Sequence, residues 1–204
     1  MAKVKIPRKS TSIDMTPMVD LGFLLLTFFI LTAQFRPEEP VVVNAPSSIS
    51  DIPIPDTDIM TISIGKKGEI FFGVDAQPTR KKMLQAMGDR YGIQFTEEEA
   101  HEFSLSPAIG VPVAQLKELL KLEPSERAKP GLQTGIPCDS ATNELRDWIA
   151  FARYSHPKAF RVAIKGDQES NYNVAKEVIA TLQAQNYNRI NLITGMEARP
   201  QITE

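Results

Sequence analysis

The sequence has almost none of the residues that form disulfide bonds or thiolate metal sites. Cys138 is the only cysteine among 204 residues, so no disulfide can form within the chain and no cage of several thiolates can hold a metal. We interpret Cys138 as a small, partly buried side chain with no assigned role. An excess of positive charge is also missing, because the formal net charge is −2. This balance excludes a general nucleic-acid binder, which needs a cationic surface.

Histidine is nearly as rare as cysteine. His101 and His156 are the only two, and their spacing is not that of a metal site. The sequence has no H-E-x-x-H pattern, no G-x-S-x-G elbow and no Gly-rich phosphate loop. We interpret His156, which precedes a proline, as an ordinary surface residue. These absences argue against an enzyme and against a metal or organic cofactor.

One long apolar run dominates the N-terminal part of the chain. Residues 21–33 read LGFLLLTFFILTA without a charge, and the extended segment 15–35 has Asp20 as its only charged residue. A membrane-spanning helix needs about 20 residues at a rise of about 1.5 Å each. The segment is therefore predicted to be a single transmembrane helix, with Thr16 as its N-cap and Pro17 as its first residue.

The charges on either side of this segment predict its orientation. Residues 1–14 carry three lysines and one arginine, whereas the charges between residues 37 and 58 are all acidic. Because basic residues stay in the cytoplasm, we expect 1–14 to be cytoplasmic and the rest to lie in the periplasm of a Gram-negative cell. A cleaved signal peptide and a buried helix of a soluble protein are the alternatives. Leu31, where a peptidase would need a small residue, favours the retained helix.

Asp20 lies near the cytoplasmic end of the predicted helix, where two interpretations are open. Its carboxylate could lie at the level of the lipid headgroups and be stabilised by the positive helix N-terminus. Alternatively, it could be shielded among other helices. The spacing of the polar residues favours the second interpretation, because Thr16, Asp20, Thr27 and Gln34 fall on one face of a helix.

A polar face is of no use to a lone anchor in lipid. It suits a helix that packs among other helices or lines a hydrated cavity. Shielding there would favour the protonated carboxyl group, so that Asp20 could bind and release a proton. Since one helix cannot enclose a path for protons, the pattern predicts partner helices.

Beyond the apolar segment, the sequence predicts a linker and one α+β domain. Residues 36–58 contain five prolines and are predicted to be extended, with a short strand possible at 41–43. The domain is expected at 59–198, interrupted by an insertion at about 92–138. Its predicted strands are 59–64, 69–72, 161–165 and 189–194, and its predicted helices are 79–91, 140–154 and 173–186. The order ββααβαβ indicates a mixed sheet with helices on one face.

The insertion has two features of its own. Residues 113–122 have the spacing of a short amphipathic helix, and an acidic run at 97–102 surrounds His101. The acidic run is interpreted as a solvated helix face, with a loose cation or partner site as the alternative.

Three separated segments resemble the ExbD/TolR family. The stretch IDMTPMVDL at 13–21 has the family's Thr-Pro, two further residues, an Asp and an apolar continuation, matched here by Thr16, Pro17 and Asp20. The stretch KGEIF at 67–71 resembles an early hairpin of the family. YNVAKEVI from 172 and NLIT from 191 resemble its last helix and strand. The long insertion departs from the family's pattern and leaves the partner surface open.

The resemblance implies a proton-driven, non-enzymatic energy-transduction subunit of the inner membrane. It implies that Asp20 translocates protons, supported by pore-facing Thr16, Thr27 and Gln34, and that no cofactor other than protons is used. It also implies a homodimer whose helices insert into a pentameric ring of ExbB- or TolQ-like multi-helix proteins, driving a TonB-like transducer for outer-membrane import. A TolR-like role in envelope integrity and a membrane-tethered module that binds peptidoglycan are the alternatives.

Overall fold

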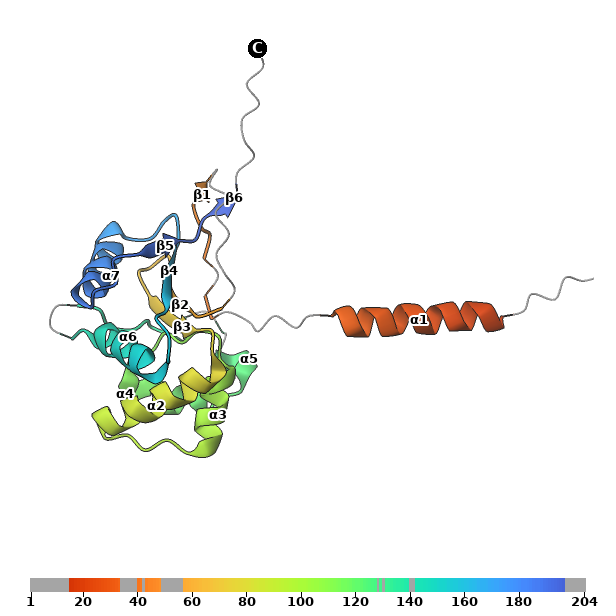
Figure 1. Ribbon diagram of the computed structural model, residues 1–204, viewed down its shortest axis with the longest axis horizontal. Helices are drawn as coiled ribbons and strands as arrows, with labels where there is room; N and C mark the ends of the chain where they lie inside the picture. Colours follow the sequence, from red (N-terminus) through yellow and green to blue (C-terminus); the bar gives the residue numbers. More distant parts are fainter. Residues whose placement is uncertain are drawn as a thin grey trace, which may run out of the picture. The chain divides into compact units, whose positions relative to one another are not determined.

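The computed structural model describes residues 15–33, 40–41, 43–48, 57–127, 129, 131–139 and 142–196. The chain divides into two compact units, Met1–Arg36 and Pro37–Glu204. Each unit is described by itself (Figure 1).

The N-terminal unit contains helix α1 (Thr16–Thr32), which has 17 residues. Pro17 lies in its first turn, where backbone N–H groups have no helical partner and proline costs little. The helix begins at Thr16, and its N-cap is Met15, without a side-chain hydrogen bond. The predicted N-cap at Thr16 and the predicted first residue Pro17 are therefore each wrong by one residue. The helix is also shorter than the predicted segment 15–35, whose last two residues lie outside the described residues. Within the described ranges, no helix is both long enough and apolar enough to cross a membrane.

The second unit is built on a four-stranded mixed sheet. Strands β2 (Ile59–Ile64) and β3 (Ile70–Val74) form an antiparallel hairpin, and β4 (Arg161–Gly166) and β5 (Ile190–Leu192) join in parallel. The strand order is β3-β2-β4-β5. The hairpin turn includes Gly68 at φ +86°, a conformation that favours glycine.

Three helices cover one face of this sheet. They are α2 (Gln77–Tyr91), α6 (Glu144–Ser155) and α7 (Tyr172–Ala184), and α6 and α7 are seen together on one side of the strands in Figure 1. The Asn143 side chain caps α6 by accepting a hydrogen bond from the Arg146 N–H. It thereby gives a partner to one of the backbone N–H groups that have none at a helix N-terminus.

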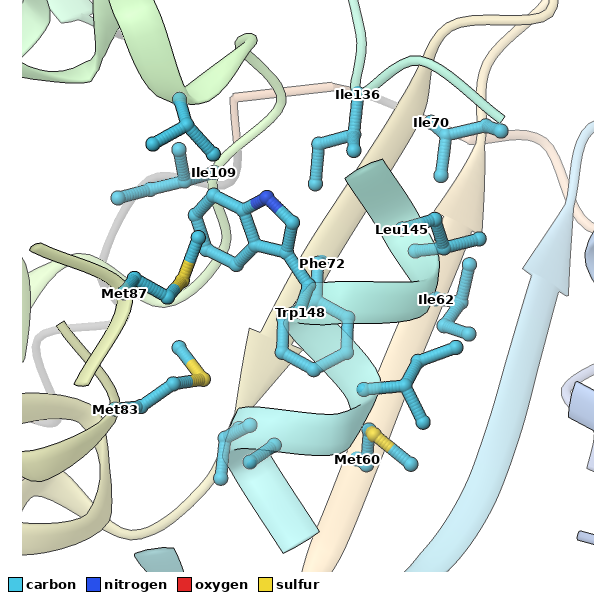
Figure 2. Close-up of a cluster of buried hydrophobic side chains, with 14 of the residues drawn as sticks. Met60, Ile62, Ile70, Phe72, Met83, Met87, Ile109, Ile136, Leu145 and Trp148 are labelled. Atoms are coloured by element: carbon cyan, nitrogen blue, oxygen red, sulfur yellow. The ribbon is translucent and has the colours of Figure 1, made fainter. Parts of the chain in front are cut away.

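Trp148 of α6 occupies the centre of the hydrophobic core (Figure 2). The indole is fully buried and lies 5.7 Å from the Phe72 ring of β3, centroid to centroid. Alternate residues of β2 point to the same core, as a strand with one helix-covered face requires. These are Met60, Ile62 and Ile64.

The predicted α+β class and the mixed sheet are confirmed. The seven predicted elements occur in the predicted order, with ends that differ by a few residues. The strand considered at 41–43 is wrong for the two described residues, neither of which is in a strand, and Val42 lies outside the described residues. The linker instead supplies β1 (Ser47–Ser48), which pairs in parallel with β6 (Gly195–Met196).

The insertion is folded into the domain and adds three helices to it. These are α3 (Glu97–Leu105), α4 (Val113–Leu120) and the single turn α5 (Pro124–Arg127). The acidic run starts α3, where Thr96 and Glu99 form a reciprocal capping box, and carboxylates there complement the helix dipole. The run therefore has a structural role as a helix start.

Candidate functional site

The predicted polar face of α1 exists as far as the structure describes it. Because α1 is a continuous helix from Thr16 to Thr32, residues Thr16, Asp20 and Thr27 lie within a sector of about 40° at about 100° per residue. Gln34, the fourth predicted member, lies outside the described residues.

Most of the remaining α1 surface is apolar and is uncovered within its own unit. Exposed fractions of its large apolar side chains range from 53% for Leu26 to 85% for Leu31. An apolar helix surface of this extent needs an apolar or protein environment around it. The surface of α1 must therefore be covered by something other than the described part of its own unit.

Two hydroxyl groups on α1 bond back to its own backbone. Thr27 Oγ1 donates to the carbonyl oxygens of Phe23 and Leu24, at 2.9 and 3.0 Å, and Thr32 Oγ1 donates to Phe28 O at 2.8 Å. This arrangement satisfies the hydroxyl proton and leaves oxygen lone pairs facing outward. The Asp20 carboxylate, in contrast, has no hydrogen bond or ion pair with another described residue.

The domain contains a second candidate site, which the sequence did not predict. A pocket of about 360 Å³ opens inside the insertion. We call it the insertion pocket. Its walls are mainly apolar and come from Pro40, Leu105, Pro107, Ala108, Ile109, Leu119 and Pro124.

The polar end of the insertion pocket is built around Arg127. This side chain is 9% exposed, pairs with Glu102 at 2.9 Å and donates to the carbonyl oxygens of Leu120 and Leu122. Gln133 is also buried; its amide donates to Arg127 O and accepts from the Gly110 N–H. Each ionic group thus has a partner, which is the condition for placing charge beneath the surface. No sequence pattern marked Arg127, because its burial depends on how the end of α4 and Glu102 of α3 come together around it.

Two residues considered in the sequence have clear structural surroundings. His156 is not the ordinary surface residue that we expected: its side chain is 8% exposed, and Nε2 lies 3.3 Å from Asp58 Oδ1. Its ring also packs against Phe160. Cys138 is buried with Sγ 3.7 Å from Thr181 Oγ1, and burial raises the pKa of its thiol. Among the described residues, no cluster of His, Cys, Asp and Glu could hold a metal ion.

Together, these observations define a protein with an apolar helix that carries one carboxylate and a separate α+β domain. The family model described as biopolymer transport protein ExbD/TolR matches residues 7–197. The chain therefore belongs to the ExbD/TolR family. No curated protein and no solved structure matches it.

Membership defines the broad role of the chain. ExbD/TolR proteins are non-enzymatic accessory proteins of biopolymer transport that take part in energy transduction for the TonB and Tol systems. They are inner-membrane proteins with periplasmic domains. They generally work with ExbB or TolQ and with TonB or TolA.

Proposed function

We propose that this chain is the proton-responsive subunit of an ExbB–ExbD type motor and that Asp20 binds and releases the protons. The observation that carries the proposal is one carboxylate on an apolar helix, without a partner among the described residues. In this proposal, segment 15–35 is the single membrane pass, residues 1–14 are cytoplasmic and the α+β domain is periplasmic.

The cost of an unpaired carboxylate supports this role. An ionised Asp at the centre of a membrane helix costs about 2.5–3.5 kcal/mol on insertion scales, and less toward the helix end. Since the described part of α1 has no basic residue, neighbouring helices have to supply polar or charged groups for Asp20. Protonation of Asp20 changes which of these contacts are favourable. The free energy available to drive such a change is about 2.3 kcal/mol for each charge that moves through a membrane potential of 100 mV.

Thr27 is suited to a supporting position along the same path. It lies seven residues beyond Asp20, which corresponds to about 10 Å along the helix axis. Because its proton is already donated to the backbone, its oxygen can accept a hydrogen bond from a water molecule. Thr16 at the helix start and Gln34 beyond the described helix complete the proposed pore-facing set.

The partners that fit are proteins able to enclose this helix. We infer a multi-helix ExbB- or TolQ-like protein, expected as a pentamer, around the α1 helices of two copies of this chain. A TonB-like transducer would carry the output to outer-membrane import. Protons are the only coupling species that this scheme needs.

Replacing Asp20 by Asn in the full chain tests the proposal. The expected result is a complex that still assembles with its partner but loses at least about nine-tenths of its proton flux and transducer-dependent uptake, because amide and carboxyl groups have similar shapes but only the carboxyl group titrates. Asp14→Asn is the matched control, because Asp14 precedes the apolar segment. Assembly is measured by copurification, and flux in vesicles with an imposed proton gradient.

Normal flux and uptake with Asp20→Asn would refute the proton role. The same outcome with normal attachment to peptidoglycan would indicate a membrane-tethered binding module. If flux is lost and the defect is leakage of the outer membrane instead of failed nutrient import, the motor is TolR-like and serves envelope integrity.

A further inference from the structure

The insertion places residues 106–109 beside the outer edge of β3, with a bend at Pro107 and a bridge to β3 at Ile109. We call residues 106–109 the edge segment. The Ile109 N–H donates to Phe72 O at 2.9 Å, and Ile109 O accepts from the Phe72 N–H at 2.8 Å. These two bonds form an antiparallel bridge. In such a pair, the backbone groups of the neighbouring residues point away from the strand just paired.

Of the two residues that flank Ile109, only Gly110 has partners among the described residues for its outward-facing backbone N–H and carbonyl groups. At Gly110, the N–H donates to Gln133 Oε1 at 2.7 Å and the carbonyl oxygen accepts from the Gly135 N–H at 2.7 Å. Gln133 and Gly135 therefore act there as a short substitute for a neighbouring strand. At Ala108, which is partly exposed, neither the N–H nor the carbonyl oxygen has a hydrogen bond with a described residue. An open donor and acceptor at a sheet edge form a template for another strand.

Ala108 lies between two hollows that are lined by different sets of residues. One is the insertion pocket, and the other is a groove of about 460 Å³ on the face of the sheet opposite the helices, lined in part by Thr61 and Ser63 of β2. Both include Pro40, Pro107 and Ala108 in their walls, so the edge segment borders the two of them. Successive side chains of a strand point to opposite sides. A strand paired with the edge segment could therefore place one side chain in the insertion pocket and the next in the groove.

The insertion pocket favours an apolar side chain over a charged one. Its only described ionic groups, Arg127 and Glu102, already neutralise each other at 2.9 Å, so an incoming charge would find no unpaired counter-charge. Leu105, at the rim, is 48% exposed, and apolar contact with a ligand would remove this surface from water. Bound lipid could fill the pocket, but it would leave the backbone of Ala108 unpaired.

We propose that the edge segment binds an extended peptide from a partner protein, which pairs with the backbone of Ala108 and inserts an apolar side chain into the insertion pocket. This mode is strand addition, in which main-chain hydrogen bonds give affinity and side-chain pockets give specificity. The site lies entirely within the second unit and does not depend on Asp20. Its failure would therefore leave the proposed proton role untouched.

The partner segment can be found by cross-linking in cells that produce the full chain. The photoreactive residue p-benzoylphenylalanine is placed at Glu123, which is exposed, does not line the pocket and directly precedes the pocket residue Pro124. The expected product joins this position to one defined peptide of another protein. An adduct to lipid, to a glycan strand or to a second copy of this chain would overturn the proposal, as would the lack of any adduct.

A synthetic peptide of the cross-linked sequence then tests strand pairing, with the full chain in detergent micelles. Ala108→Pro removes the open N–H without breaking an internal bond and should weaken binding about tenfold, the equivalent of about 1.4 kcal/mol. Ser125→Trp, which fills the pocket mouth, should weaken binding at least as much. Glu123→Trp is the matched control, because Glu123 is exposed but does not line the pocket, and its binding should be unchanged.

Hydrogen exchange at Ala108 gives a direct readout on the unaltered protein. The Ala108 amide should exchange rapidly in the free chain and at least about tenfold more slowly in the peptide complex. Binding that leaves this amide unprotected, or equal affinity for the Ala108→Pro and Ser125→Trp variants and the unaltered chain, would overturn strand addition at this site. Because the exchange measurement needs no substitution, a misfolded variant does not remove the test.

Discussion

Replacing Phe103 by Ala should destabilise the whole domain, although Phe103 belongs to the insertion. Its side chain is 3% exposed, and its ring stacks on Trp148 with centroids 6.1 Å apart and an interplanar angle of 30°. Removing a buried Phe ring typically costs about 3–5 kcal/mol, because apolar contacts are lost and a cavity remains. That is a large share of the roughly 5–15 kcal/mol that stabilises a domain.

Urea unfolding of the full chain in detergent measures this effect conveniently. Trp148 is the only tryptophan, so its fluorescence reports on the centre of the core. With a urea dependence of about 2 kcal/mol per molar, a loss of about 4 kcal/mol should lower the fluorescence midpoint by about 2 M. Leu105→Ala in the same helix is the control and should have a much smaller effect, because Leu105 is 48% exposed.

The reasoning would be refuted by an effect confined to the insertion. In that case, Phe103→Ala would speed amide exchange in α3 and α4 but move the Trp148 fluorescence midpoint by less than about 0.5 M. Such a result would mean that the insertion unfolds as an independent module.

Two further predictions concern positions outside this stacked pair. Gly110→Ala should destabilise the domain by about 1–3 kcal/mol in thermal unfolding, because the added Cβ atom would clash with the Phe71 ring and the buried ring would have to shift. Gly166→Ala is the control and should have little effect, because its Cβ atom would come no closer than 4.0 Å to Ser170 Oγ. The backbone N–H groups of Glu169 and Asn44 lower the pKa of Asp167 from its usual 3.8. Its contribution to stability is therefore complete above about pH 4 and is lost as the pH falls through the lowered value, so Asp167→Asn should flatten the acid limb of a stability–pH profile and speed exchange of the Asn44 amide at neutral pH.

The regular part of the fold could be predicted because local patterns and tertiary packing agree there. Polar and apolar residues alternate through β2, and the apolar residues Leu145, Trp148 and Ile149 recur at helical spacing in α6. Both patterns describe one buried face, and the structure buries those faces together. The start of α3 also has a local signal, the capping-box spacing of Thr96 and Glu99, which we did not use in the prediction.

The insertion pocket could not be predicted because distant residues create it. The antiparallel bridge joins Phe72 to Ile109 across a chain segment that includes two helices, and no local pattern specifies such a pairing. Arginine is usually a surface residue, but the Arg127 side chain is buried here. Its guanidinium group donates hydrogen bonds to carbonyl groups at the end of α4 and to Glu102 of α3. His156 was misjudged for the same reason, because its partner Asp58 lies at the end of the linker.

The contacts of residues 43–48 give the domain a defined point at which it can bear mechanical load. The Asn44 N–H donates to Asp167 Oδ2 at 2.9 Å, the Asn44 carbonyl accepts from the Gln168 N–H, and β1 pairs with β6. Tension applied through Pro40 would therefore reach the turn between β4 and α7 before it reached β2. If these contacts of Asn44 and β1 broke under load, residues 43–48 could extend while the four-stranded sheet stayed intact. The sheet would then be protected from the first part of the pull.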